Sequence, residues 1–526
     1  MTRSLPEEIK RRRTFAIISH PDAGKTTLSE KLLLYGQAIQ KAGIVTKKAN
    51  RSRTVSDWME IEQSRGISIT SSALQFDWKG TRYNLLDTPG HGDFSEDTYR
   101  TLMAVDSAIM LIDSVKGVEP QTVKLFKVCR ERGIPIFTFI NKMDRPGKNP
   151  FDLLEEVEEV LGILAVPMTW PIGEPGEFKG VYDRESGESM LYERTSGGQW
   201  QAPVSCGSLT SPKMKALISP GDHQRITDDM ELVDDVLHPF EEESFLEGEL
   251  TPVFFGCAIN NFGIDHFLET FTKLAPPPAP LKTKEGEVQP DQKNFIAFVY
   301  KVQANMDRNH RDRMAFIRVS TGMFEKNMTV RHQRTGKKIK LSYSYRLFGQ
   351  KREIIEQAFP GDIVGLVNPG IFRVGDTLTT GGSIRMLPFP RFAPELFARV
   401  YLLDQSQNKS FRKGIEQLGE EGVVQVFTDK KKTGNLPVLA AVGLLQMEVF
   451  KERMKTEYRC DCRLETLEYT SSRWLSEDVD QEEQFSFKVM HDELSRPVAL
   501  FRNEWHLNQC LTNAHGLEFY QHPPEE

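Results

Sequence analysis

The sequence predicts an α/β domain with a P-loop, followed by an antiparallel β-barrel and by an α+β domain of ferredoxin-like order. Three observations carry this prediction. Apolar, strand-like runs ending in polar loops continue as far as a proline-rich stretch at 275–280. Short strands with turn signals fill 295–382, as in barrels. From 395 to 469 the order is strand, helix, strand, strand, helix, strand, which is the split βαβ pattern.

Composition narrows the class of protein. The chain has 526 residues, 39% of them hydrophobic and 27% charged, which is an ordinary globular balance. The net charge of −7 does not require a nucleic-acid partner, although 10–13 and 430–432 are local basic clusters. Six cysteines in so long a chain do not form a disulfide scaffold. Since no apolar leader or membrane-length apolar run is evident, we expect a cytoplasmic protein with no membrane contact.

The first site signal is a strand–turn–helix pattern near the N-terminus. An apolar run at 15–18 precedes the turn, and a helix-compatible segment at 28–34 follows it. This is the layout of a P-loop, in which backbone N–H groups and a helix N-terminus bind phosphate. Lys25 would contact the β- and γ-phosphates, and the Thr26 hydroxyl would bind Mg²⁺. The candidate nucleotide-binding residues are Ser19 (where the pattern has Gly), His20, Pro21, Asp22, Ala23, Gly24, Lys25, Thr26 and Thr27.

A second signal is a polar stretch at 41–65 that leads into 65–70, Arg-Gly-Ile-Ser-Ile-Thr. A loop that the γ-phosphate orders must offer a hydroxyl to Mg²⁺. Ser68 is the candidate metal ligand and Thr70 the alternative. Taken alone, the pattern is equally that of an ordinary Ser/Thr-rich strand start.

The third signal follows an apolar strand at 83–86. Carboxyl ends of strands are where α/β sheets bind ligands, so the carboxylate of Asp87 is a candidate for holding Mg²⁺ through water. Gly90 would let its backbone N–H approach the γ-phosphate, and the imidazole of His91 could position the attacking water. The candidate residues of this segment are Asp87, Thr88, Pro89, Gly90 and the catalytic candidate His91.

The fourth signal concerns the base of the nucleotide. A strand at 134–140 ends in Asn141, Lys142, Met143 and Asp144. The Asp144 carboxylate can accept hydrogen bonds from guanine N1–H and its amino group, a pair that adenine lacks. A later strand end, with Gly256, Cys257 and Ala258, offers backbone amides to the guanine O6. The predicted ligand is therefore GTP, with GDP as the product.

These four motifs together resemble the translational GTPases of the elongation-factor class. In that class the His after Asp-Thr-Pro-Gly is catalytic, so the resemblance implies the same role for His91. Most members carry Thr at the position of Ser68 and Ala or Gly at that of Ser19. Ser68 keeps the hydroxyl that Mg²⁺ requires, and Ser19 is small enough for the turn.

Within that class, the bacterial class II release factors resemble this chain at 65–72, 169–182, 252–263 and 420–446. The resemblance covers nearly the whole chain and weakens after about residue 475. It implies a ribosome-dependent GTPase of translation termination that stimulates the class I release factors and promotes their dissociation. The implied partners are the ribosome, through rRNA and ribosomal proteins, and the class I factors, with the chain itself a monomer.

The predicted domains are a GTP-binding domain at 1–280 with an insertion around 165–245, a barrel at 290–387, and a ferredoxin-like domain at 388–526 with a C-terminal helical tail. Two alternatives remain open at this stage. One is another ribosomal translational GTPase. The other is the GTPase subunit of sulfate adenylyltransferase, which also joins a GTPase domain to a barrel.

Overall fold

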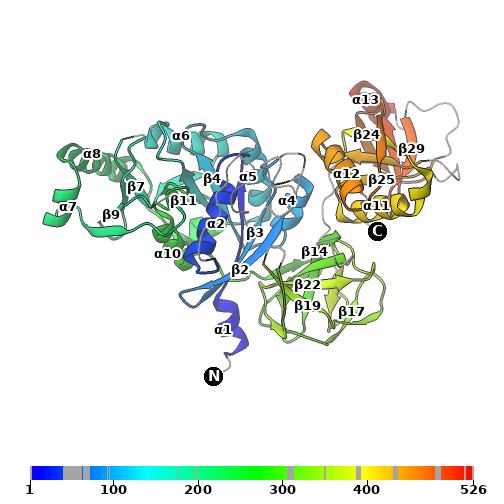
Figure 1. Cartoon of the computed structure of the whole chain (residues 1–526), viewed down its shortest axis with the longest axis horizontal. Coiled ribbons are helices and arrows are strands. Elements are labelled where there is room, and N and C mark those ends of the chain that lie inside the picture. The colour runs from blue at the N-terminus through cyan, green and yellow to red at the C-terminus, as the bar shows by residue number, and fades with distance from the viewer. Residues whose placement is uncertain are drawn as a thin grey trace.

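The structure is a computed structural model. It describes residues 3–39, 62, 71–91, 93, 95–174, 176–195, 198–304, 313–348, 351–384, 386, 393–429, 436–479, 487–513 and 517–523. The α/β domain lies at one end of the molecule, and the barrel and the third domain lie side by side at the other (Figure 1). No helix within these ranges is long and apolar enough to cross a membrane.

The α/β domain is built on a seven-stranded sheet in the order β2-β3-β1-β4-β5-β11-β6. All its neighbouring strands are parallel except β2 and β3. Because β3 and β4 lie on opposite sides of β1, the loops after β1 and its neighbours meet at one edge, where open α/β sheets bind ligands. The strands are β1 (Arg12–Ser19), β2 (Ser72–Trp78), β3 (Thr81–Asp87), β4 (Ser107–Asp113), β5 (Ile136–Asn141), β6 (Leu164–Pro167) and β11 (Leu250–Phe255).

Both faces of this sheet are buried, which explains the unbroken apolar runs of its strands. Along β1, Ala16 and Ile18 belong to one hydrophobic core, while Phe15 and Ile17 belong to the other. This alternation follows from the two-residue period of a strand. The helices of the domain are α1 (Leu5–Lys10), α2 (Lys25–Tyr35), α4 (Ser95–Leu102), α5 (Pro120–Arg132), α6 (Pro150–Leu161), α9 (Glu242–Glu247) and α10 (Ile264–Leu274).

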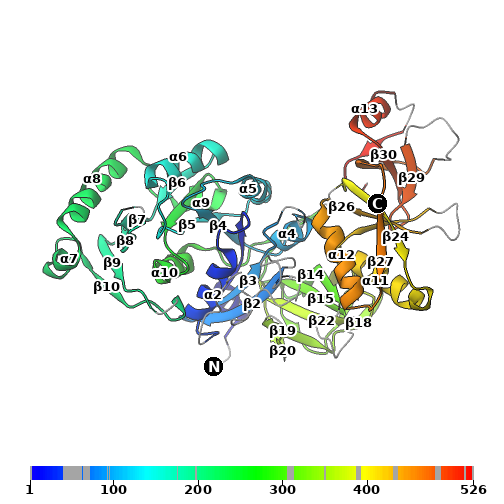
Figure 2. The same ribbon diagram turned by 45° about the horizontal axis from the view of Figure 1, so that its top comes forward.

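The insertion carries its own four-stranded antiparallel sheet and two helices at the outer end of the domain (Figure 2). Trp170 fastens it to the main sheet: the ring is 1% exposed and lies 4.7 Å from that of Phe151 and 5.7 Å from that of Phe255, between centroids. The elements are β7 (Thr169–Ile172), β8 (Gly180–Asp183), β9 (Glu188–Tyr192), β10 (Val204–Ser208), α7 (Pro212–Leu217) and α8 (Pro220–Val236).

The middle of the chain is the predicted antiparallel β domain. Its eight-stranded curled sheet has the order β18-β17-β23-β14-β15-β22-β19-β20, with β16 pairing β21 beside it. A short hairpin, β12 (Leu281–Thr283) with β13 (Gly286–Val288), precedes it. The strands are β14 (Ile296–Ala304), β15 (Arg313–Thr321), β16 (Phe324–Glu325), β17 (Thr329–His332), β18 (Lys338–Lys340), β19 (Ser344–Phe348), β20 (Lys351–Ile354), β21 (Gln357–Ala358), β22 (Ile363–Asn368) and β23 (Thr377–Thr379).

The third domain confirms the ferredoxin-like prediction. Its sheet order, β25-β26-β24-β27, is that of a split βαβ unit, and α11 and α12 connect the strands. The elements are β24 (Leu396–Leu402), η3 (Gln405–Gln407), α11 (Asn408–Glu421), β25 (Gln425–Phe427), β26 (Val438–Ala441), α12 (Leu444–Thr456) and β27 (Cys462–Thr466).

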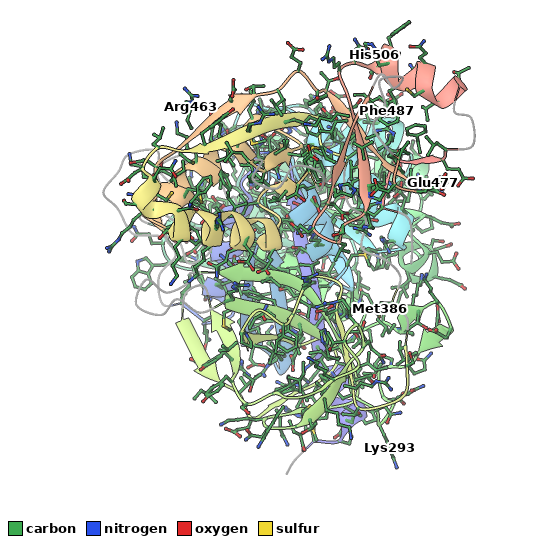
Figure 3. All side chains as sticks on the ribbon, turned by 90° about the vertical axis from the view of Figure 1, so that its right-hand side faces the viewer. Lys293, Met386, Arg463, Glu477, Phe487 and His506 are labelled. Carbon is green, nitrogen blue, oxygen red and sulfur yellow. The ribbon has the colours of Figure 1, made fainter. Side chains whose placement is uncertain are left out.

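The last part of the chain contains more than the expected helical tail. A second four-stranded sheet, β29-β30-β28-β31, accompanies one helix. Strand β28 pairs with β30 and β31, which lie further along the chain, so local periodicity does not reveal this sheet. Figure 3 shows Phe487 on this sheet and His506 on the helix at the outer edge. The elements are β28 (Ser471–Leu475), β29 (Phe487–His491), β30 (Pro497–Phe501), α13 (Glu504–Asn513) and β31 (Phe519–Tyr520).

A buried ion pair joins the α/β domain to the barrel. Arg318 of β15 donates to Asp106 Oδ1 over 2.6 Å, and the two side chains are 7% and 2% exposed. Asp106 Oδ1 also accepts from Ala279 N, in the proline-rich linker, over 2.9 Å. The domain bounds 1–280, 290–387 and 388–526 remain a proposal, and it is supported because each large sheet takes its strands from one of these ranges.

Candidate functional site

The loop between β1 and α2 has the shape of a phosphate cradle. Gly24 has φ +106°, and a Cβ there would overlap the Asn141 side-chain amide, so only glycine suits the position. Lys25 is 7% exposed, and its Nζ lies 3.7 Å from Asp87 Oδ1, too far for a hydrogen bond. Among the described residues, Lys25 Nζ has no hydrogen-bond partner. A buried, unsatisfied ammonium beside a helix N-terminus fits an anionic ligand.

The other residues of this loop are held by their neighbours. The backbone carbonyls of Asp22 and Ala23 accept from Lys142 and Asn141, respectively. His20 Nε2 lies 3.3 Å from a carboxylate oxygen of Glu119. Ser19 is buried at the end of β1, and Thr26 and Thr27 lie half-buried in the first turn of α2. Pro21 faces the loop after β3.

The loop after β3 lies directly beside the phosphate loop. Asp87 is the parallel neighbour of Ile17 and is 2% exposed. The Thr88 hydroxyl donates to the Ile17 carbonyl over 2.7 Å, so this side chain fastens the ends of β1 and β3 together. Pro89 and Gly90 are buried, and a Cβ at Gly90 would lie 3.6 Å from Pro21 Cα.

The predicted Mg²⁺ ligands fall partly within the described residues. Thr26 lies in the first turn of α2, and Asp87 ends β3 next to β1. They offer hydroxyl and carboxylate oxygens, the ligand types that Mg²⁺ prefers. This donor set fits the ion. Ser68 and its alternative Thr70 lie outside the described residues.

His91 follows this loop at the surface. Its side chain is 41% exposed, and its Nδ1 lies 3.2 Å from Asp93 Oδ1. An imidazole held by one nitrogen can present the other to water.

Asn141 connects the phosphate loop to the base loops. Its side-chain Nδ2 donates to the Ala23 carbonyl over 2.9 Å, and its Oδ1 accepts from Ala258 N over 2.9 Å. The side chain is 2% exposed. Asn141 therefore ties three loops together.

Lys142 bridges the same loops with its charge. Its Nζ donates to the Asp22 carbonyl and to Asp113 Oδ2, the latter over 2.7 Å. Burial raises the pKa of Asp113, but the hydrogen bond from Lys142 and the Val115 N–H outweigh it, and the pKa is lowered. Asp113 thus stays ionised and holds Lys142 against the P-loop.

Asp144 and Cys257 meet at the base-binding end. The Cys257 thiol donates to Asp144 Oδ1 over 3.0 Å and accepts from Asn260 Nδ2 over 3.3 Å. Burial and the nearby Asp144 carboxylate raise the pKa of Cys257 to about 12, so the thiol stays neutral. Met143 has a buried side chain, and its N–H donates to the Gly256 carbonyl over 3.2 Å. All seven predicted base residues therefore lie in one connected group.

Three residues of the site escaped the sequence analysis. Asp113 ends β4 beside two strands whose ends are predicted site residues, and that position is a signal that could have revealed it. Asp93 follows His91 by two residues. Asn261 has no sequence signal: its side chain donates to the Gly198 and Trp200 carbonyls, a contact made only by the fold.

The insertion also contacts α2. The Lys31 ammonium donates to the Gly198 carbonyl. Asn261 Nδ2 donates to the same carbonyl over 2.8 Å. Burial lowers the pKa of Lys31 to about 8. The loop around Gly198 is therefore fixed to both α2 and the base loop.

Family models match the chain along most of its length. The Elongation factor Tu GTP binding domain matches 10–277, and Elongation factor G domain 2 matches 294–381. The Class II release factor RF3, C-terminal domain, matches 387–511. The first of these matches spans half of the chain, so the α/β domain is a GTP-binding domain whose ligands are GTP and GDP.

Similar proteins cover nearly the whole chain. A peptide chain release factor 3 from Symbiobacterium thermophilum is 51% identical over 98% of each chain, and one from Gloeobacter violaceus is 50% identical over 99% of each. A crystal structure of a Thermus thermophilus protein aligns with a TM-score of 0.71 at 21% identity, over 92% of this chain and 72% of that one, which shows a shared fold. The chain therefore belongs to the peptide chain release factor 3 family.

Proposed function

We propose that this protein is a ribosome-dependent GTPase of translation termination that stimulates the class I release factors and promotes their dissociation from the ribosome. The structural observation behind this proposal is that the phosphate loop and the base loop both bond to Asn141. This one buried side chain joins the phosphate loop at Ala23 to the base loop at Ala258. Family membership supports the termination role, since the relatives bear that name along nearly their full length.

The residues divide the binding of GTP between them. The Lys25 ammonium and the N–H groups at the start of α2 would hold the phosphates, and the Asp144 carboxylate would hold the guanine edge. Mg²⁺, held by Thr26, Ser68 and the carboxylate of Asp87, would neutralise charge on the β- and γ-phosphates when bound. Lys142 holds the base loop against the P-loop by donating to the Asp22 carbonyl, and it also donates to the Asp113 carboxylate.

Hydrolysis forms a bond from a water oxygen to the γ-phosphorus and breaks the bond to the bridging oxygen, whose electrons leave with GDP. The proton of the water ends on inorganic phosphate or solvent. His91 would position that water. Loss of the γ-phosphate would then release the loops around His91 and Ser68 and lower the affinity for the ribosome.

The test is class I release factor turnover on stop-codon ribosomes, with the class I factor limiting. This protein with GTP should accelerate multiple turnover, and the same protein with GDP or without nucleotide should not. No acceleration, together with ribosome-stimulated GTP hydrolysis, would contradict the termination role and leave another ribosomal GTPase as the function. Neither the family models nor the relatives favour the sulfate adenylyltransferase subunit.

Three finer points complete the proposal. The protein acts as a monomer in the cytoplasm, and it contacts rRNA and ribosomal proteins directly. Size-exclusion chromatography with light scattering tests the monomer, since a dimer would double the mass of 60.0 kDa. Ribosome pelleting with GTP, GDP or no nucleotide tests the nucleotide dependence of ribosome binding.

A further inference from the structure

One carboxylate lies between the candidate catalytic residue and the third domain. Asp93 Oδ1 is 3.2 Å from His91 Nδ1. Asp93 Oδ2 accepts from the backbone N–H of Leu445 over 2.7 Å. Leu445 is the second residue of α12, and Figures 1 and 2 show α12 next to α4 of the α/β domain. A helix N-terminus favours a carboxylate, so the contact is attractive as well as directional.

The third domain has room for this carboxylate at one position. A Cβ at Gly443, which precedes α12, would overlap the Asp93 carboxyl group. The φ of Gly443 is −145°, so alanine would suit the backbone, and the absent side chain matters only for the space. The Gln446 side chain accepts from Val442 N over 2.7 Å, and the Leu445 N–H donates to Asp93.

A second contact holds the same surfaces together. Arg100 of α4 donates to the Glu421 carbonyl at the end of α11 over 3.4 Å. A Cβ at Gly422 would overlap the Arg100 guanidinium. The third domain therefore packs closely on the segment that carries His91 and Asp93.

The position of Asp93 sets the orientation of the imidazole. The backbone N–H of Asp93 donates to His91 Nδ1 over 3.3 Å, and Asp93 Oδ1 lies 3.2 Å from the same nitrogen. The Asp93 side chain is in turn held by the Leu445 N–H. If that side chain is released, the Asp93 N–H that orients the ring shifts with it.

We propose that Asp93 is a positioning residue for His91, and that the third domain places it through the Leu445 N–H. Docking of the third domain thereby sets the orientation of the imidazole, and movement of that domain changes the rate of hydrolysis without changing how GTP is bound. This inference rests on the proposed ribosome-dependent hydrolysis.

The experiment measures ribosome-stimulated GTP hydrolysis in full-length variants, with kcat, KM for ribosomes and Kd for GTP determined separately. Asp93→Ala should lower kcat by roughly 10²-fold, because a misplaced catalytic group costs about that much. Asp93→Asn should lower it less, because one acceptor oxygen remains. Gly443→Ala should lower kcat by about tenfold although it lies in the third domain. Kd for GTP should stay within about twofold in all three, since none contacts the phosphate or base loops.

Gly382→Ala, where a Cβ would meet no atom within 4 Å, is the matched control and should behave as the wild type. The decisive comparison is a double-mutant cycle. In an Asp93→Ala background, Gly443→Ala should cause no further loss, because its methyl group has no carboxylate to displace.

Equal losses from Gly443→Ala in both backgrounds would overturn the role of the third domain. An unchanged kcat in Asp93→Ala would overturn the positioning role, provided that the wild type is stimulated. A wild type without ribosome stimulation would instead overturn the proposed function, and the inference with it.

Discussion

At the scale of single residues, Asp144 sets which base is accepted. Its Oδ1 already accepts from the neutral Cys257 thiol, so the carboxylate is oriented before nucleotide arrives. Asp144→Asn replaces an acceptor by a donor and should weaken guanine nucleotides by about 10²-fold or more while favouring xanthine nucleotides. Competition between GDP and XDP in equilibrium binding measures this change in relative affinity. Unchanged guanine affinity would refute the assignment.

His91 acts at a different stage. His91→Ala should leave GTP affinity within about twofold and reduce ribosome-stimulated hydrolysis by about 10²- to 10⁴-fold, the range for a lost general acid–base group. Quench-flow hydrolysis on ribosomes gives the rate, and filter binding gives the affinity. Hydrolysis at the wild-type rate would remove His91 from the mechanism.

Most of the residues that the sequence predicted for this site lie together, because strand-end positions and motif spacing are local properties. Lys25, Asp87, Asn141 and Asp144 are such cases. Asp93 and Asn261 are not, since their partners, Leu445 and Gly198, come from other parts of the chain. Spacing along the chain carries no information about such contacts.

At the scale of elements, α2 and the insertion loop meet at Lys31. Because burial lowers the pKa of Lys31 to about 8, the unfolded chain, with a lysine pKa near 10.4, binds more protons between these two values. The free energy of unfolding should therefore rise with pH across that window. Over this pH window, the free energy of unfolding of the wild type should rise by up to about 3 kcal/mol relative to that of Lys31→Met, which has no charge to bury.

Urea unfolding of both proteins at about pH 7 and about pH 10 measures this gain, with Lys282→Met, an exposed lysine, as the control. A difference that stays flat, or that falls as pH rises, would contradict a buried ammonium at Lys31.

Elements with a strong local pattern were predictable, and those that depend on distant pairing were not. The strands and helices from Leu396 to Thr466 follow the predicted order because each has its own apolar periodicity. The sheet that contains β28 and β30 forms by pairing residues such as Ser471 and Phe501, and the sequence analysis expected only a helical tail there.

At the scale of the whole molecule, the α/β domain and the barrel share the pair Asp106 and Arg318. Asp106→Ala would leave the buried Arg318 guanidinium with the Ala104 carbonyl as its one hydrogen-bond partner among the residues that the structure describes. Removing one partner of a buried ion pair costs about 3–5 kcal/mol, so the free energy of unfolding of these two domains should fall by that amount. Differential scanning calorimetry measures the shift.

The matched control is Glu356→Ala, which removes an exposed barrel ion pair to Lys326 and should cost at most about 1 kcal/mol. Equal shifts for the two variants would show that Asp106 does not join the domains.

The linker tied to Asp106 at Ala279 has a consequence for motion. A tether this short keeps the barrel at an effective concentration in the millimolar range beside the α/β domain. A detached barrel would rebind unless contacts worth several kcal/mol were lost at once, since each tenfold loss of affinity corresponds to about 1.4 kcal/mol. We therefore expect the domains to rotate about the contact at Asp106 rather than to separate. A small change at the nucleotide would then produce a larger displacement at the far end of the third domain.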